Sequence, residues 1–295
     1  MPMPTDIGVI DLMIGFPQAD RRHNYDFLRA NLRDRESLDD FEFPAQYMFK
    51  NVPKGEARDD QVAALLELMD KFGIERAMIG VGSQADQRGD DARRALRDHP
   101  DRFFGCMEVD PNRGMDAVRD LVRGVEELGV KAASAFPCGL NPQVPINDKK
   151  FFPIYAKCIE LDIPIFVCVG VPGPRVPMAC QHMELVDEVC WFFPELRFVT
   201  RHGCEPWTDL AVKLLLKWPN LYYSTSAFAP RYYPEAIVEF ANTRGADKVM
   251  YAGYYPMGLS LDRIFKELPG VPFRDHVWPK FLRENAIRVF GLDQR

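Results

Sequence analysis

The residues best suited to chemistry lie in one stretch, residues 196–207, which reads LRFVTRHGCEPW. An apolar run typical of a buried strand ends at Arg201 and His202, and Glu205 and Trp207 then open an amphipathic segment. The proline between those two residues and the acidic side chain both suit the first turn of a helix. His202 is therefore expected where a strand gives way to a helix, the side of an α/β barrel on which catalytic residues gather. Strand alternation is expected to turn Arg201 away from the barrel axis unless the strand has already ended.

Each of four further residues could take part in chemistry, and each also has a simpler structural explanation. Asp11 lies inside an apolar run, where its carboxylate must find a partner, through an ion pair or a role in catalysis. Cys168 ends the run PIFVCVG and is either a small core residue or a nucleophile. Arg175 follows the motif VGVPGP, where its planar fork suits a carboxylate, although a loop arginine is usually solvated. Tyr254 would donate a hydrogen bond to a ligand or simply fill space.

The order of elements predicts the scaffold that positions these residues. Short apolar runs alternate with amphipathic helical patterns, which indicates a parallel sheet. Eight such units favour closure into a (β/α)8 TIM barrel, with all 295 residues in a single domain. A doubly wound open sheet is the rival fold, but the glycine-rich GxGxxG turn that it usually carries is absent from the sequence. The strands are expected at residues 7–15, 74–82, 102–109, 130–136, 164–170, 196–202, 221–228 and 248–253.

Residues 16–58 form a long insertion after the first strand. The segment has no sustained period and is too long for an ordinary connection between elements. Its aromatic content is typical of a lid or of an interface, and dimers are the commonest assembly, so a homodimer is expected. The aromatic residues are Tyr25, Phe27, Phe41, Phe43, Tyr47 and Phe49.

Composition narrows the class of partner. A formal net charge of −6 and no cluster of basic residues argue against nucleic acid. Seven cysteines without a CxxC pair suggest reduced thiols in the cytoplasm. The first residues do not resemble a signal peptide, and no apolar run reaches the ~18 residues of a membrane span. We expect a cytoplasmic protein that binds neither nucleic acid nor membrane.

Several motifs fall together at the predicted strand ends, and with them the chain resembles the amidohydrolase superfamily. They are Ile10-Asp11-Leu12, VGVPGP at 169–174, RHGCEPW at 201–207, YAGYYPM at 251–257 and RENAIRVFGL at 283–292. The most similar branch contains aminocarboxymuconate-semialdehyde decarboxylase and the hydroxybenzoate decarboxylases. The resemblance covers nearly the whole barrel. It implies a (β/α)8 barrel, one divalent metal (zinc or manganese) and decarboxylation or hydrolysis of small carboxylates.

The ligand positions that this resemblance implies are largely changed. The family holds its metal with two histidines after strand 1, one each after strands 5 and 6, and an aspartate after strand 8. Those positions here are Met13, Gly15, Cys168, His202 and Tyr254. Because catalytic zinc needs about three ligands from His, Asp, Glu or Cys, we expect no metal cofactor. A residual divalent metal such as zinc, held with help from Asp11 or Glu205, is the alternative.

Two functional hypotheses follow. The first is a metal-independent hydrolase or lyase of the decarboxylase or lactonase type, acting on a small carboxylate-bearing molecule. Some lactonases of the superfamily dispense with metal. His202 would be the acid or base, and Asp11 is a further catalytic candidate. In a variant, Cys168 on the neighbouring strand is the nucleophile, with a lowered pKa. The substrate would be held by Arg175, Glu205, Trp207 and Tyr254. The second hypothesis is a catalytically silent barrel that binds a ligand or another protein, since a fold alone does not guarantee activity.

Overall fold

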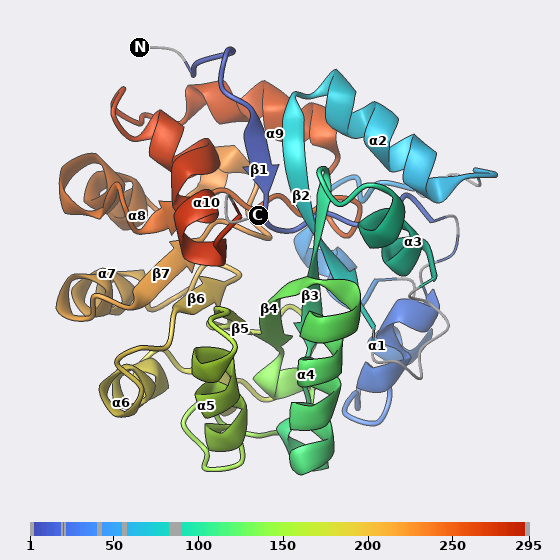
Figure 1. Cartoon of the computed structure of the whole chain (residues 1–295), viewed down its shortest axis with the longest axis vertical. Helices are drawn as coiled ribbons and strands as arrows, with labels where there is room; N and C mark the ends of the chain where they lie inside the picture. Colours follow the sequence, from blue (N-terminus) through green and yellow to red (C-terminus); the bar gives the residue numbers. More distant parts are fainter. Residues whose placement is uncertain are drawn as a thin grey trace.

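The computed structural model describes residues 3–18, 20, 22–39, 43–54, 58–82 and 90–292. Within these ranges eight parallel strands form one curled sheet, in which each strand pairs with its neighbour in sequence (Figure 1). The predicted (β/α)8 barrel is confirmed. The strands are β1 (Val9–Asp11), β2 (Ile74–Val81), β3 (Phe103–Glu108), β4 (Val130–Ala135), β5 (Ile165–Cys168), β6 (Phe198–Arg201), β7 (Leu221–Ser224) and β8 (Val249–Met250).

Helices surround the sheet and cover its outer face (Figure 1). They are α2 (Gln61–Lys71), α3 (Asp90–Asp98), α4 (Met115–Leu128), α5 (Phe152–Glu160), α6 (Leu185–Phe192), α7 (Thr208–Lys217), α8 (Glu235–Phe240), α9 (Leu261–Glu267) and α10 (Asn285–Phe290). The pattern of residues 147–161 predicts a helix with Asn147 as its N-cap. In the structure α5 begins at Phe152, and the Asn147 amide donates to Glu188 Oε2 at 2.6 Å. None of the described helices is long and apolar enough to cross a bilayer.

Alternation along the strands decides which side chains reach the inside of the barrel. Phe104 and Cys106 of β3, Phe166 of β5 and Val199 of β6 pack together in the interior cluster. Since side chains two residues apart share a face of a strand, the next inward positions are at the carboxyl ends of these strands. Those positions are Glu108, Cys168 and Arg201.

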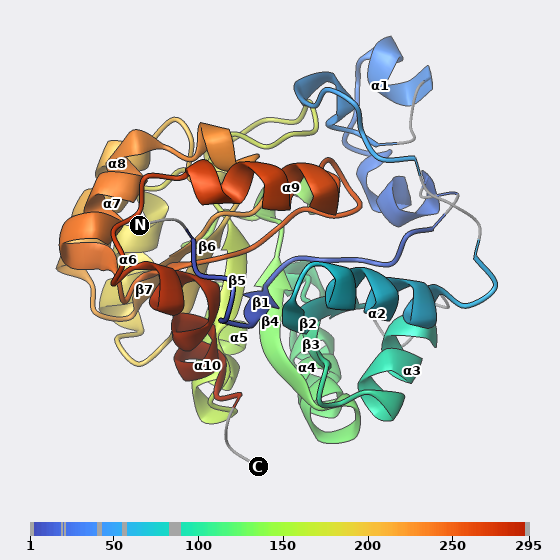
Figure 2. The same cartoon turned by 90° about the horizontal axis from the view of Figure 1, so that it is seen from above.

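The insertion after β1 lies on one side of the barrel. It contains the 3-10 helices η1 (Arg22–Leu28) and η2 (Gln46–Met48), and the short helix α1 (Arg35–Asp39). In Figure 2 its blue ribbon stands clear of the ring of helices, near α9 and α2. The described parts of residues 16–58 are called the arm below.

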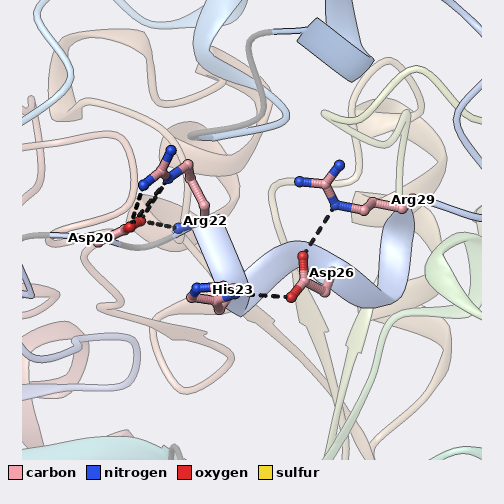
Figure 3. A network of polar contacts seen from close by, with 5 residues as sticks. All are labelled: Asp20, Arg22, His23, Asp26 and Arg29. Carbon is pink, nitrogen blue, oxygen red and sulfur yellow. Dashed lines mark hydrogen bonds and ion pairs between the residues drawn. The ribbon is translucent and has the colours of Figure 1, made fainter.

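Exposed ion pairs shape the first turn of the arm (Figure 3). Arg22 Nη2 contacts Asp20 Oδ2 at 2.6 Å. Asp26 accepts from Arg29 Nε at 3.1 Å, and its other oxygen lies 3.2 Å from His23 Nδ1. Exposed pairs of this kind contribute little stability, so this cluster defines local geometry and not a functional site.

A buried carboxyl group joins the first strand to the chain that follows the last one. Asp11 Oδ1 accepts from the backbone N–H of Met13 at 2.9 Å and of Gly253 at 2.8 Å. An isolated parallel bridge between Ile14 and Tyr255 continues the same seam. A Cβ at residue 253 would lie 2.6 Å from Asp11 Oδ2, so only glycine fits there. Burial raises the pKa of Asp11 to about 7, against the opposite effect of the two backbone hydrogen bonds.

We predict that Asp11→Asn makes the protein more stable at neutral pH. An unfolded aspartate loses its proton near pH 4, whereas the folded residue keeps it until about pH 7, so ionisation destabilises the fold across that window. Asparagine still offers a carbonyl oxygen to both N–H groups and does not ionise. The gain in the free energy of unfolding should reach up to about 4 kcal/mol near pH 7 and vanish near pH 4. Urea unfolding of both proteins at several pH values measures it, and an equal pH dependence in the two would contradict the pKa shift.

Candidate active site

A cavity of about 620 Å³ lies between the carboxyl ends of the strands and the arm. This volume is in the usual range for sites that bind small molecules. The barrel contributes Glu108, Cys168, Arg201 and His202 to its wall, and the arm contributes a set of mainly apolar side chains. The site therefore combines charged groups from the barrel with an apolar covering.

Aromatic rings link the arm to the barrel above the cavity. Tyr254, which follows β8, stacks on Phe49 with ring centroids 5.6 Å apart and lies 6.2 Å from Phe43. Tyr25 contacts Phe43 in turn, at 5.8 Å. The structure thus places these aromatic residues over the barrel mouth, whereas Phe41 lies outside the described residues.

Arg175, which was expected to grip a carboxylate ligand, is absent from the cavity wall. Its Nη1 pairs with Asp34 Oδ2 at 2.7 Å and with Glu36 Oε2 at 2.8 Å, and both carboxylates belong to the arm. The guanidinium also lies 4.6 Å from the ring of Tyr47, whose hydroxyl donates to the Gly173 carbonyl at 2.7 Å. Arg175 therefore fastens the arm to the loop after β5.

Two other expected site residues are also placed elsewhere. Trp207 packs against the ring of His182 with a centroid separation of 3.9 Å and is absent from the cavity wall. Asp11 lies in the seam between β1 and the chain after β8 and does not line the cavity. Of the expected residues, the structure brings together Cys168, His202, Glu205 and Tyr254.

Arg201 points into the cavity, which corrects the predicted direction of its side chain. The prediction took His202 as the inward residue of the strand, but β6 ends at Arg201, which continues the inward face of Val199. Its Nε is buried and has no hydrogen-bond partner within the described ranges, and no described carboxylate forms an ion pair with it. Burial lowers the pKa of Arg201, but the nearby acidic groups, in their ionised forms, raise it more, so the guanidinium stays charged.

Glu108 is a site residue that the motif analysis missed. It ends β3, and its side chain is surrounded by protein but remains open to the cavity, whose wall it lines. The described residues give its carboxyl group no hydrogen bond or ion pair. Burial raises its pKa, the Arg201 guanidinium lowers it, and the net direction is upward. Alternation in FFGCME, with Phe104 and Cys106 inside, would have identified it.

His202 reaches the cavity because the backbone turns, with a positive φ of 68° directly after the strand. Its backbone N–H donates to Ser226 Oγ at 3.0 Å, and Nδ1 of its ring lies 3.2 Å from the same oxygen. Burial and the Arg201 cation lower the pKa of His202 well below its usual value, so the ring is neutral. If the Ser226 hydroxyl donates to Nδ1, the ring proton is on Nε2, where it can be donated to a ligand.

Cys168 faces the cavity beside Arg201, with which it is in register between β5 and β6. Burial raises the pKa of its thiol to about 12, although the Arg201 cation acts in the opposite direction. This direction is the one expected of a core cysteine, not of a nucleophile with a lowered pKa. Within the described residues, no hydrogen bond connects its sulfur to the His202 ring.

Comparison with known proteins identifies the family. An amidohydrolase family model matches residues 19–292. The chain belongs to the amidohydrolase family. A 2-keto-4-carboxy-3-hexenedioate hydratase from a Sphingobium species is 29% identical over 126 residues, which cover 35% of this chain and 36% of that protein. The match thus spans about a third of this curated relative.

Two solved structures share the fold of this amidohydrolase-family chain. An uncharacterised TIM-barrel protein from Bordetella bronchiseptica, Bb4693, has a TM-score of 0.72 and 20% identity, with 98% of this chain and 100% of that chain covered. A 5-carboxyvanillate decarboxylase from Novosphingobium aromaticivorans has a TM-score of 0.70 and 18% identity, with coverages of 97% and 96%. That decarboxylase was crystallised with manganese and 4-hydroxy-3-methoxy-5-nitrobenzoic acid.

The residues of this chain do not fit the metal that the family implies. No three His, Cys, Asp or Glu side chains within the described ranges are placed to hold a metal ion. The positions of the family's ligands include Met13, which lines the cavity, and Gly15, which has no side chain. Cys168 has Arg201, a permanent cation, in register with it on the next strand. A second cation in this place would meet repulsion instead of ligands.

We predict that Cys168 reacts with iodoacetamide no faster than the other six cysteines, all of which are buried. A thiol with a raised pKa carries little thiolate at neutral pH, so alkylation should require unfolding. His202→Ala should leave its rate unchanged. Mass spectrometry across pH measures the labelling. Fast labelling below neutral pH that slows in His202→Ala would restore the nucleophile hypothesis.

Proposed function

We propose that this chain is a metal-independent hydrolase or lyase, of the decarboxylase or lactonase type, that acts on a small carboxylate-bearing molecule. Arg201 carries the proposal, because its guanidinium lines the cavity without an ion partner among the described residues. A guanidinium binds a carboxylate through two parallel hydrogen bonds. A buried charge left unpaired is costly to the fold, and a bound carboxylate would offset that cost.

Other cations in the cavity wall are less suited to this role. Arg263 Nε pairs with Glu267 Oε1 at 3.0 Å, so its charge already has a partner. Lys50 is exposed on the arm, where water screens it. Arg201 alone of the three combines a place at a strand end with a buried, unpartnered nitrogen.

Neutral hydrogen-bond donors beside Arg201 support the proposal of a carboxylate ligand. His202 offers Nε2–H when Ser226 donates to Nδ1, and burial raises the pKa of Tyr254 so that its hydroxyl keeps its proton. A cation and fixed donors would stabilise negative charge that develops on a ligand oxygen. The aromatic arm would keep water away and so strengthen these interactions.

The names of the relatives agree with a carboxylate substrate. One is a hydratase of a keto-carboxy-hexenedioate, and another is a decarboxylase of a carboxyvanillate. A silent barrel that binds a carboxylate without turning it over remains the second candidate, favoured by the loss of the family's ligand positions.

We predict that Arg201→Gln weakens the binding of benzoate, used as a simple carboxylate probe, by about 10- to 100-fold, because a charge-assisted pair contributes about 1.5–3 kcal/mol. The matched control is Arg197→Gln, which lies just before β6 and pairs with Asp162 Oδ1 at 2.9 Å, outside the cavity wall. It should bind benzoate like the unchanged protein.

Calorimetry measures both affinities, and equal binding by the two variants and the unchanged protein would contradict the role of Arg201. A panel of aromatic and unsaturated carboxylates, followed for release of carbon dioxide or for water addition, then separates the two candidates. Arg201-dependent binding without turnover of any panel member would favour the silent barrel.

A further inference from the structure

We propose that Glu108 is the acid–base residue of this cavity and exchanges one proton with the molecule that Arg201 anchors. The inference rests on the proposed function and adds to it a catalytic group and a narrower ligand class. Glu108 and Arg201 are an acidic and a basic side chain that line the same cavity and do not form an ion pair with each other.

The topology explains why Glu108 and Arg201 stay apart. They end β3 and β6, and β4 and β5 lie between these strands in the sheet. Both side chains face inward, so they face each other across the barrel mouth, and no ion pair joins them within the described structure. Each nonetheless influences the pKa of the other. A ligand that fills the space between them would meet a cation on one side and a carboxyl group on the other.

The other titratable groups at the strand ends are poorly matched to proton transfer at neutral pH. Burial raises the pKa of Cys168 to about 12, and it also raises the pKa of Tyr254, so both hold their protons. His202 is held neutral by burial and by the nearby guanidinium, so it does not take up a proton. Glu108 differs, because it is a carboxyl group with a raised pKa that lines the same cavity as Arg201 without pairing with it.

The groups that face Glu108 define the direction of that shift. Burial favours the protonated form, and Asp110, two residues further along, adds a negative charge in the same direction. Asp110 is itself occupied, since its side chain accepts from the Asn112 N–H at 2.9 Å. Arg201 opposes both effects, while the neighbouring thiols of Cys106 and Cys168 remain uncharged because burial raises their pKa values.

The proton balance of the step is simple. The O–H bond of Glu108 breaks, its proton goes to a carbon or oxygen atom of the ligand, and the electron pair stays on the Glu108 carboxylate. Water supplies the next proton after the product leaves, and in the opposite direction the carboxylate removes a proton from the ligand. Such a ligand needs a carboxylate at one end and a protonatable oxygen or carbon at the other. The class is therefore hydroxy- or oxo-carboxylates.

The test compares Glu108→Gln with Glu126→Gln, a change at an exposed glutamate on α4, and uses benzoate as the probe. The carboxylate of bound benzoate places a negative charge near Glu108 and favours its protonated form. The unchanged protein should therefore take up a fraction of a proton on binding at pH values above the ordinary midpoint of a glutamate. Calorimetry in two buffers of different ionisation enthalpy measures the uptake. Glu126→Gln should retain it, whereas Glu108→Gln should bind benzoate without it.

A second measurement does not depend on any ligand. Carbon-13 NMR of the glutamate side chains, assigned with Glu108→Gln, should give Glu108 a titration midpoint above the ordinary value of about 4.3, and Arg201→Gln should raise it further. A midpoint at or below the ordinary value would overturn the inference, as would proton uptake that persists in Glu108→Gln. Binding of benzoate that is indifferent to Arg201→Gln would instead overturn the proposed function.

Discussion

A positive charge without an ion partner, at the inner end of β6, is the constraint on which the site depends. The Arg201 guanidinium is fixed in the barrel mouth by strand alternation and stays charged there. It helps to keep His202 neutral and lowers the pKa of Glu108 against the stronger effect of burial. It also disfavours a metal ion beside Cys168. In the proposed account, this charge holds the carboxylate of the ligand.

The arm covers the site through contacts between segments that are far apart in the sequence. Phe43 and Phe49 reach Tyr254 across about 200 residues of chain, and Arg175 is drawn to Asp34 and Glu36 by charge. The arm is thus held at two points, one aromatic and one ionic. The aromatic contacts line the cavity, so access for a ligand and attachment of the arm are linked there.

Much of the fold could be predicted from the sequence, because strand and helix periods are local. The eight strands appear in the predicted order, although β8 is only Val249–Met250 and the helix expected from Asn147 begins at Phe152. Element ends depend on partners that local periodicity does not reveal, such as Glu188 for Asn147. The buried hydrogen bonds of the Asp11 carboxyl group likewise depend on Gly253, which is distant in sequence.

The site was predictable only in part, for reasons that differ between residues. Cys168, His202, Glu205 and Tyr254 follow from their places at strand ends. Arg201 was assigned to the wrong face because the phase of alternation was set on His202, which in fact reaches the cavity through a positive φ. Glu108 belongs to none of the family's ligand positions, so only the phase of β3 would have revealed it.

A crystal structure of the protein soaked with benzoate, recorded with anomalous data at a zinc or manganese edge, tests the central claim most directly. The account predicts the carboxylate in the barrel mouth with both oxygens about 2.8 Å from the Arg201 guanidinium, and no anomalous peak between residues 13, 168 and 202. A metal ion at that point, or a carboxylate bound elsewhere with Arg201 still unpaired, would contradict it.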